Sequence, residues 1–319
     1  MIFGSSALKI LITGGFGYIG GRLAQYLFKH GHEIFLGTRN KISRPPFWLP
    51  QATVVETDWT CTSKLIQICD NMDIIIHAAG MNAQDCHKDF IAALEFNGVG
   101  TARLLQAAIQ QKVRRFLYIS TAHVYGYPLI GNITEETSPL NLDSYATSHR
   151  AGEDVVRSAD QYGKIEGIVV RLSNAFGVPV QKEVDCWKLL VNDLCSQAVI
   201  TKKICLSTSG VQRRDFVPLL DVCRAIENLL HQPRHALGDG LFNIGGEFAP
   251  TVWEFAEIIQ KECELMLGFR PLLSRTSQEK EKNGVLQYQI TALRQIGFEL
   301  KADPIEEIDR LLRFCRKVF

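Results

Sequence analysis

A glycine-rich segment near the start of the chain has the residue types and spacing needed to bind a phosphate group. Thr13–Gly20 reads T-G-G-F-G-Y-I-G, follows the apolar run Leu8–Thr13 and opens a helical pattern. Gly14 allows a tight turn, Gly17 lets the backbone approach a pyrophosphate, and Gly20 permits close packing of helix on strand. A helix N-terminus adds free N–H groups and a partial positive charge. The segment therefore predicts a dinucleotide site.

The end of the second predicted strand, Glu33–Leu36, indicates which dinucleotide binds. NAD sites usually place Asp or Glu there to hold the ribose 2′-OH, but Gly37–Asn40 contains no carboxylate. Arg39 could pair with a 2′-phosphate, or it is a solvated surface arginine. We therefore expect NADP(H) to be favoured over NAD(H). Asp58 and Trp59 follow the third predicted strand and are candidates for contacts with adenine, or are a cap and a packing residue.

Alternating strand and helix patterns position these residues. The expected strands are Leu8–Thr13, Glu33–Leu36, Thr53–Glu56, Asp73–His77, Arg115–Ser120 and Glu166–Leu172, and the expected helices are 17–30, 90–111 and 145–162. After Asn174 the rhythm changes. Helical patterns at 184–197, 219–231, 252–267 and 304–317 are mixed with short apolar stretches, and the polar segment 274–283 predicts a surface loop.

The alternation is typical of an α/β protein with a doubly wound, Rossmann-type parallel sheet. We expect a dinucleotide-binding domain at residues 1–175. A smaller α/β domain at 176–319 would mainly bind the substrate and return in part to the Rossmann sheet.

Composition excludes several other classes of protein. The 319 residues carry a formal net charge of +1, so nothing points to nucleic acid or an acidic membrane surface as a partner. The nine cysteines are scattered and contain no C-x-x-C pair, so we expect reduced thiols and no metal site. The chain shows no signal-peptide pattern and no apolar run of about 18 residues. We expect a cytoplasmic protein without a membrane partner.

Seven motifs occur in the order found in a known family. They are Thr13–Gly20 (T-G-x-x-G-x-x-G), His77–Gly80, Asn97–Thr101 (N-x-x-G-T), Ser120–Gly126 (S-[ST]-x-x-V-Y-G), Tyr145–Glu153 (close to Y-x-x-S-K-x-x-x-E), Arg171–Asn174 and Arg214–Val217. Together they resemble the extended short-chain dehydrogenase/reductases, the NAD-dependent epimerase/dehydratase superfamily, in its nucleotide-sugar branch. The resemblance implies a nucleotide-activated sugar as substrate and a homodimer formed through the helices at 90–111 and 145–162.

The resemblance also assigns catalytic roles. In this family a tyrosine is the acid/base for a sugar hydroxyl or ketone, a Ser or Thr orients that oxygen, and hydride passes between the same carbon and nicotinamide C4. Tyr145 matches the tyrosine and Thr121 its partner. With the residues above, the expected cofactor-binding set is Gly14, Gly17, Tyr18, Ile19, Gly20, Arg39, Asp58, Trp59, Ala78, Ala79, Asn97, Tyr145 and His149.

His149 departs from the family pattern, because a lysine usually stands four residues after the tyrosine. The lysine lowers the tyrosine pKa and holds the nicotinamide ribose. A histidine lies on the same helical face, but its charge is largely lost above about pH 6.5. The chain is therefore an enzyme with weaker tyrosine activation, whose rate has a histidine-like step with pH, or a non-catalytic dinucleotide-binding sensor or scaffold.

A second departure follows Thr121. Family 4,6-dehydratases carry Asp-Glu, or Glu alone, where this chain has Ala122 and His123. Without that carboxylate we expect no 4,6-dehydration, which leaves a 4-keto reductase or a 4-epimerase. His123 is either an acid/base for the substrate or a binding or packing histidine.

The second half carries the expected substrate-binding residues. Asn174 matches a substrate-contacting asparagine, Arg214 an arginine that grips the nucleotide phosphates, and Arg294 loosely a late arginine of similar role. Each also has a structural explanation: a turn residue, a strand-end salt bridge and a surface helix charge, respectively. Thr121 and His123 complete the expected substrate contacts.

Overall fold

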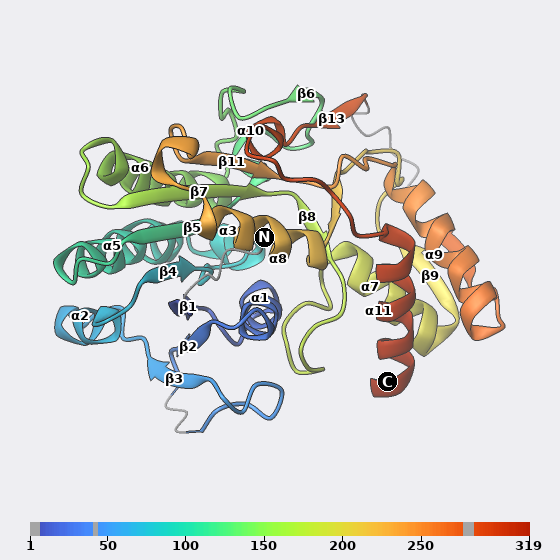
Figure 1. Ribbon diagram of the computed structural model, residues 1–319. Helices are drawn as coiled ribbons and strands as arrows, with labels where there is room; N and C mark the ends of the chain where they lie inside the picture. Colours follow the sequence, from blue (N-terminus) through green and yellow to red (C-terminus); the bar gives the residue numbers. More distant parts are fainter. Residues whose placement is uncertain (1–6, 41–43, 277–283) are drawn as a thin grey trace. The chain divides into compact units, whose positions relative to one another are not determined.

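A computed structural model describes residues 7–40, 44–276 and 284–319 (Figure 1). Its main sheet has seven strands in the order β11-β7-β5-β4-β1-β2-β3. Their bounds are β1 (Lys9–Thr13), β2 (Glu33–Thr38), β3 (Thr53–Glu56), β4 (Ile74–His77), β5 (Arg115–Thr121), β7 (Glu166–Leu172) and β11 (Leu241–Ile244). Ile10–Ile12 in β1 and Ile74–Ile76 in β4 are fully buried, as expected for parallel strands covered on both faces.

The strand order reverses at β1, which pairs in parallel with β2 on one side and β4 on the other. Thr13 at the end of β1 is in register with Gly37 and with His77. The carboxyl ends of these three strands therefore lie at one edge of the sheet. This is the topological switch point at which open α/β sheets bind ligands.

Helices cover the sheet within the first of two compact units, residues 1–124, 141–171 and 226–242. Their bounds are α1 (Tyr18–Lys29), α2 (Thr62–Cys69), α3 (Ala83–Lys88), α4 (Phe90–Ala93), the π-helix η1 (Leu94–Gly100), α5 (Thr101–Gln110), the short 3₁₀ turns η2 (Ala122–Val124) and η3 (Arg234–Ala236), α6 (Ser144–Gln161) and the end of α8 (Leu219–His231). α2, α5 and α6 lie along one side of the sheet and α1 lies on the other (Figure 1). Leu65, Leu104 and Val156 bring α2, α5 and α6 into one core with Leu11 and Phe116 of the strands.

The second compact unit comprises residues 125–140, 172–225 and 243–319. It has three two-stranded parallel pairs: β8 (Asn174–Phe176) with β10 (Phe216–Pro218), β9 (Lys203–Leu206) with β12 (Leu272–Arg275), and β6 (Gly131–Ile133) with β13 (Leu286–Tyr288). Its remaining helices are α7 (Leu190–Thr201), α9 (Val252–Leu267), α10 (Thr291–Gln295) and α11 (Pro304–Val318). α7, α9 and α11 share a core that includes Leu194, Phe255 and Leu311.

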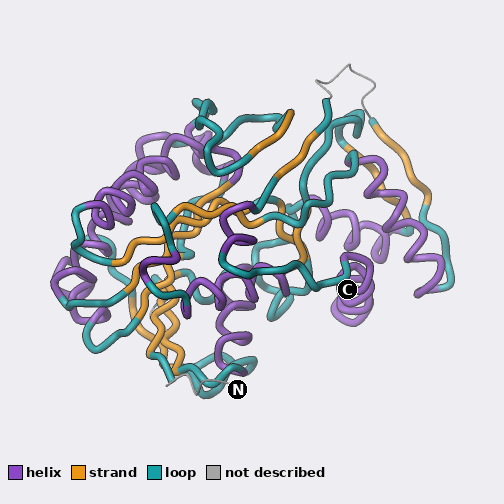
Figure 2. Tube along the Cα trace, turned by 45° about the horizontal axis from the view of Figure 1, so that its top comes forward, coloured by secondary structure: helices purple, strands orange, loops and turns teal. Residues whose placement is uncertain are grey.

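Local sequence signals explain the ends of these helices. At α9, Thr251 and Glu254 form a reciprocal capping box, and Gly268 ends the helix with a φ of 77°. α11 begins with Asp303 as N-cap and Pro304 in its first turn. Figure 2 shows the strand–helix alternation that the sequence predicts for the first half of the chain.

Two expected helices differ from the structure. The pattern at 90–111 is not one helix but α4, η1 and α5 in succession, and the middle segment is a π-helix. The helix expected at 184–197 begins only at Leu190, because residues 184–189 form turns instead; Trp187 Nε1 donates to the Lys182 carbonyl oxygen at 2.8 Å. The loop expected at 274–283 lies partly in β12 and otherwise outside the described residues.

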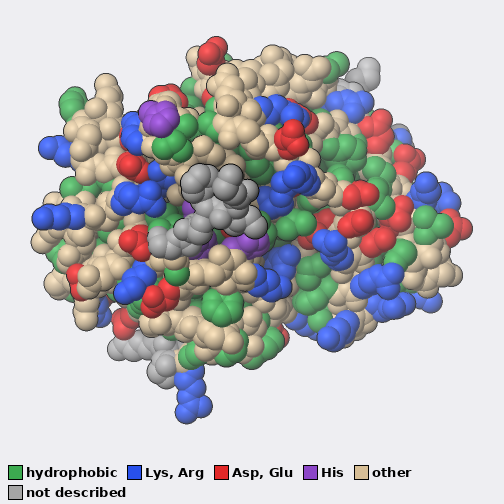
Figure 3. All heavy atoms as spheres, in the orientation of Figure 1, with side chains coloured by type: hydrophobic (Ala, Val, Ile, Leu, Met, Phe, Trp, Pro, Cys, Tyr) green, Lys and Arg blue, Asp and Glu red, His purple; other side chains and the backbone are tan. Residues whose placement is uncertain are grey.

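Charged side chains of both signs are interspersed on the face shown in Figure 3, in keeping with the small net charge. The nine cysteines are free thiols, and all but Cys61 and Cys205 are buried. Within the described ranges, no helix combines the length and the apolar character needed to cross a bilayer.

Candidate active site

The glycine-rich loop joins β1 to α1 at the switch point. Gly14 has a φ of 68°, and a Cβ built on it would lie 2.8 Å from the Ala78 carbonyl oxygen. A Cβ on Gly20 would lie 2.3 Å from the Gly14 carbonyl oxygen, so α1 packs directly on the loop. Gly17 is the exposed N-cap of α1 and provides no side-chain cap for the first-turn N–H groups. The loop is thus a backbone cradle that fits a dinucleotide pyrophosphate. Tyr18 and Ile19 form the first turn of α1, and Ala78 and Ala79 follow β4 beside Gly14.

The residues expected near the adenine and its ribose lie at the same edge. Arg39 is exposed just after β2, and its guanidinium lies 5.4 Å from the centre of the Phe96 ring. Asp58 accepts hydrogen bonds from the Thr60 hydroxyl at 2.7 Å and from Lys64 at 3.2 Å, and these bonds, Thr60 first, lower its pKa. Trp59 packs against Phe96 and His77. Asp58 and Trp59 therefore already have local structural roles, whereas Arg39 projects from the end of β2.

Asn97 lies in the π-helix η1, a form that occurs mostly at functional sites. Its amide oxygen accepts from the Met81 N–H at 2.8 Å, and its amide nitrogen donates to the Ser148 hydroxyl at 3.0 Å. Asn97 thus ties η1 to the segment after β4 and to α6. The sequence pattern identified Asn97 but not the π-turn that holds it.

Tyr145 and Thr121 are brought together by β5 and α6. Thr121 ends β5 and is buried, and Tyr145 lies in the first turn of α6, where Asp143 caps the helix by accepting from the Ala146 N–H at 2.8 Å. The Tyr145 hydroxyl and Thr121 share a side-chain hydrogen bond. Burial raises the pKa of Tyr145 to about 12, although this hydrogen bond acts in the opposite direction. Tyr145 is therefore a protonated phenol at neutral pH.

His149 follows Tyr145 by one helical turn, and the two ring centres are 4.6 Å apart. Its Nδ1 is 2.9 Å from the Tyr118 hydroxyl, which leaves Nε2 toward Gly80. Burial, with repulsion from His123 as a smaller cause, lowers the pKa of His149 to about 4. His149 is therefore neutral throughout the physiological range, so it supplies no charge to activate Tyr145. The expected loss of charge near pH 6.5 is shifted to a more acidic pH.

A buried polar chain behind His149 was missed at the sequence level. His77 joins the Thr13 hydroxyl at 2.6 Å to the Thr101 hydroxyl at 3.0 Å, and Thr101 donates to the Asn97 carbonyl at 2.6 Å. Because Thr101 donates elsewhere, it accepts from His77 Nε2–H, and His77 Nδ1 accepts from Thr13. Burial lowers the pKa of His77 to about 3, in keeping with this neutral tautomer. A motif containing His77 was visible in the sequence, but not its partners.

A buried ion pair holds α6 against the sheet. The Arg171 guanidinium donates to Glu153 at 2.6 and 3.0 Å, and Ser120 donates to the same carboxylate at 2.6 Å. Glu153 is two turns beyond Tyr145, and Ser120 directly precedes Thr121. Gly152 permits this approach, because a Cβ there would lie 2.7 Å from the Tyr118 hydroxyl. The pair therefore fixes α6 relative to the end of β5.

His123 lies in η2, with its ring centre 6.1 Å from that of Tyr145. Its carbonyl oxygen accepts from the Asn141 amide at 2.9 Å. The structure thus places His123 beside the tyrosine and leaves open both an acid/base and a binding role.

The expected substrate residues of the second unit all have protein partners. The Asn174 amide donates to the Asp215 carbonyl oxygen at 2.9 Å. Arg214 donates to Gln212 at 3.1 Å and to the Tyr127 hydroxyl at 3.1 Å. Arg294 is exposed and forms an ion pair with Glu247. These contacts are the structural roles named as alternatives, and Arg214 alone stands beside an aromatic hydroxyl.

Comparisons with known proteins agree with this architecture. A family model described as NAD dependent epimerase/dehydratase family matches residues 10–245. The dTDP-D-glucose 4,6-dehydratase of Mus musculus is 26% identical over 346 residues, covering 99% of this chain and 91% of that protein. A putative UDP-glucose 4-epimerase of Methanocaldococcus jannaschii is 23% identical over 320 residues, covering 96% of this chain and 98% of that protein.

Solved structures share the fold. The UDP-glucuronic acid 4-epimerase from Bacillus cereus, in complex with UDP-glucuronic acid and NAD, aligns with a TM-score of 0.81 at 21% identity over 98% of this chain and 100% of that one. A putative epimerase from Burkholderia cenocepacia aligns with a TM-score of 0.83 at 21% identity over 99% of this chain and 100% of that one. The fold and the family expected from the motifs are both confirmed. The family model spans more than half of the 319 residues, and the chain belongs to the NAD dependent epimerase/dehydratase family.

Proposed function

We propose that this protein is an NAD(P)-dependent oxidoreductase acting on a nucleotide-activated sugar, as a 4-keto reductase or a 4-epimerase. The observation that carries the proposal is the hydrogen-bonded Thr121–Tyr145 pair, with His149 one turn farther along α6. The nicotinamide cofactor donates or accepts the hydride when bound. Tyr145 transfers the proton of the sugar oxygen, and Thr121 orients that oxygen. With Nδ1 beside Tyr118, His149 has Nε2 for a ribose hydroxyl.

The protonation state of Tyr145 favours the reductive direction. A phenol with a pKa of about 12 retains its proton at neutral pH and can donate it to a ketone oxygen as hydride arrives. Oxidation requires the opposite transfer, for which a buried phenol beside a neutral histidine is a weak base. A reductase needs only the acid role, whereas an epimerase uses both. The same features support the alternative of a non-catalytic dinucleotide-binding protein.

A thermal-shift screen of nucleotide sugars, followed by assays with NADPH or NADH, tests the proposal. A sugar that stabilises the folded protein is incubated with reduced cofactor in its 4-keto form, and separately assayed for 4-epimerisation. We expect cofactor consumption or an epimer. Detection of a 4-keto-6-deoxy product at about one turnover per second would instead make the protein a dehydratase despite Ala122 and His123. Cofactor and sugar binding without turnover would establish the non-catalytic alternative.

Cofactor preference follows from Arg39. We expect the protein to bind NADP(H) more tightly than NAD(H), because β2 ends without a carboxylate and with an exposed guanidinium. Arg39→Ala should weaken NADP(H) binding about 10- to 100-fold, the usual value of a charge-assisted contact, and leave NAD(H) binding nearly unchanged. Arg114→Ala is a matched control, since Arg114 is an exposed arginine at the opposite end of β5. Calorimetric titration showing that the unmodified protein binds NAD(H) equally well would contradict the preference.

We further propose a homodimer formed through the helices at 90–111 and 145–162 and a cytoplasmic location. The exposed apolar side chains Phe90, Ile91, Leu94 and Val99 on α4 and η1 support such an interface. The free cysteines are in keeping with a reducing compartment.

A further inference from the structure

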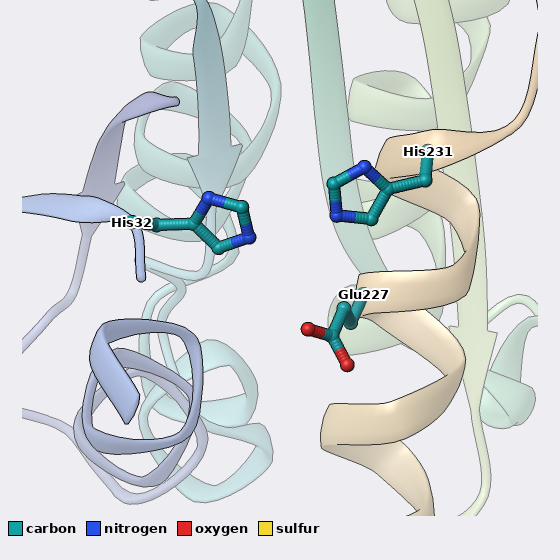
Figure 4. Close-up of side chains that lie close together, drawn as sticks. All are labelled: His32, Glu227 and His231. Carbon is teal, nitrogen blue, oxygen red and sulfur yellow. The ribbon is translucent and has the colours of Figure 1, made fainter. Parts of the chain in front are cut away.

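His32, Glu227 and His231 converge at the edge of the sheet opposite the glycine-rich loop. His32 lies in the turn between α1 and β2, one residue before β2 begins, and the other two side chains are one turn apart on α8. One ligand atom from each residue lies within 4.8 Å of the others. Figure 4 shows the two imidazole rings facing each other with the Glu227 carboxylate beside the gap. Nearly two hundred positions separate His32 from its partners, so no sequence motif signals this cluster.

His32 has an unsatisfied nitrogen directed into the cluster. The residue is 3% exposed. Its Nδ1 accepts from the Leu8 N–H at 3.3 Å, whereas its Nε2 is buried and has no hydrogen-bond partner in the described part of the chain. Buried polar atoms are nearly always paired, and an orphan next to two other donor groups indicates a missing ligand.

The surroundings orient Glu227. The Tyr26 hydroxyl donates to its Oε2 at 2.8 Å, and His30 Nδ1 lies 3.8 Å from its Oε1. A ligating carboxylate is usually held by such an outer hydrogen bond, which leaves the second oxygen for a cation. Burial is the main cause that lowers the pKa of both His32 and His231, which keeps their rings neutral and able to coordinate.

We propose that His32, Glu227 and His231 form a binding site for a zinc-class divalent cation, with a fourth position open to water. Two imidazoles and a carboxylate are a common zinc ligand set, with bond lengths of about 2.0–2.2 Å. Tetrahedral coordination requires the ligand atoms to approach within about 3.5 Å, so the side chains must close by on the order of 1 Å. Glu227 is only partly buried and His231 is exposed, so both have room to adjust.

Coordination through His32 Nε2 requires the ring proton to reside on Nδ1. The long hydrogen bond from the Leu8 N–H is then lost, and this is the structural cost of the site. The cation would link the start of β2 to the end of α8, both within the first compact unit. Since the cluster is at the amino edge of the strands and the glycine loop at the carboxyl edge, the site is structural and separate from the catalytic residues. It departs from the sequence-based expectation of no metal, which considered the cysteines.

Zinc titration of the metal-stripped full chain tests the site. We expect one equivalent to bind and to raise the melting temperature. His231→Gln removes an exposed ligand without disturbing the core, and should weaken binding by more than the 10- to 100-fold typical of an outer-shell change. His235→Gln, on the exposed turn η3, is the matched control and should bind normally.

Cobalt substitution separates this site from the cysteines. Nitrogen and oxygen ligands give visible d–d bands without a thiolate charge-transfer band, and the bands should disappear in His231→Gln and in Glu227→Gln. A thiolate band, or unchanged stoichiometry in His231→Gln, would overturn the proposal, as would absence of binding to the unmodified chain.

Discussion

Tyr145→Phe is expected to lower turnover about 10²–10⁴-fold on a verified substrate, because it removes the hydroxyl that transfers the proton. The phenyl ring retains its packing against His149, whose ring centre is 4.6 Å away. Cofactor affinity should therefore remain nearly unchanged, which distinguishes a chemical defect from misfolding. Steady-state rates and calorimetric titration of the cofactor measure the two effects separately.

Tyr162→Phe provides the matched control, because Tyr162 is exposed at the end of the same helix. It should retain full activity. If Tyr145→Phe keeps more than about a tenth of the unmodified rate, Tyr145 is not the acid/base, and the non-catalytic alternative or another base becomes the better explanation.

Substitutions at His149 test how the tyrosine is activated. His149→Ala should lower the rate further, since it removes the ring between Tyr118 and Tyr145. His149→Lys should preserve or raise the rate, because a positive charge one turn away lowers a phenol pKa. The pH profile carries a sign: with the pKa of His149 at about 4, the reductive rate should show no step near pH 6.5. A step there would mean that the bound state raises this pKa.

Much of the catalytic edge could be predicted because its signals are local. The glycine spacing, the buried runs of β1 and β4 and the N-cap of α6 each act within a few residues of the chain. The strands at 53–56 and 166–172 have the expected bounds for the same reason. Thr121 and Tyr145 then meet because parallel strands and their connections converge at one edge.

Interactions between distant segments could not be predicted in this way. The π-turn around Asn97 depends on hydrogen bonds to Met81 and Ser148, not on helix propensity, so the pattern at 90–111 resembled one regular helix. The pKa of His149 depends on burial, which the sequence does not reveal. The turns before α7 formed where apolar spacing predicted a helix, because Trp187 packs against Phe319 across the second unit.

Breaking the Glu153–Arg171 pair is expected to have the largest effect on stability. Glu153 is 0% and Arg171 1% exposed. Removing one partner leaves the other charge buried and uncompensated, which typically costs about 3–5 kcal/mol. We expect Arg171→Met to lower the free energy of unfolding by this amount, as measured by urea denaturation. Lys88→Ala is the control, since the exposed Lys88–Asp85 pair contributes at most about 1 kcal/mol.

A double replacement shows whether the pair serves stability or position. Glu153→Leu with Arg171→Met removes both charges, so it should be less destabilising than the sum of the single changes. The double variant also loses the bond from Ser120 to Glu153, which fixes α6 beside the end of β5. If the pair mainly positions Tyr145, this variant should recover stability but remain slow, with cofactor binding retained. Recovery of both stability and rate would show that packing alone aligns Tyr145 with Thr121. Equal losses in Arg171→Met and Lys88→Ala would contradict the burial argument itself.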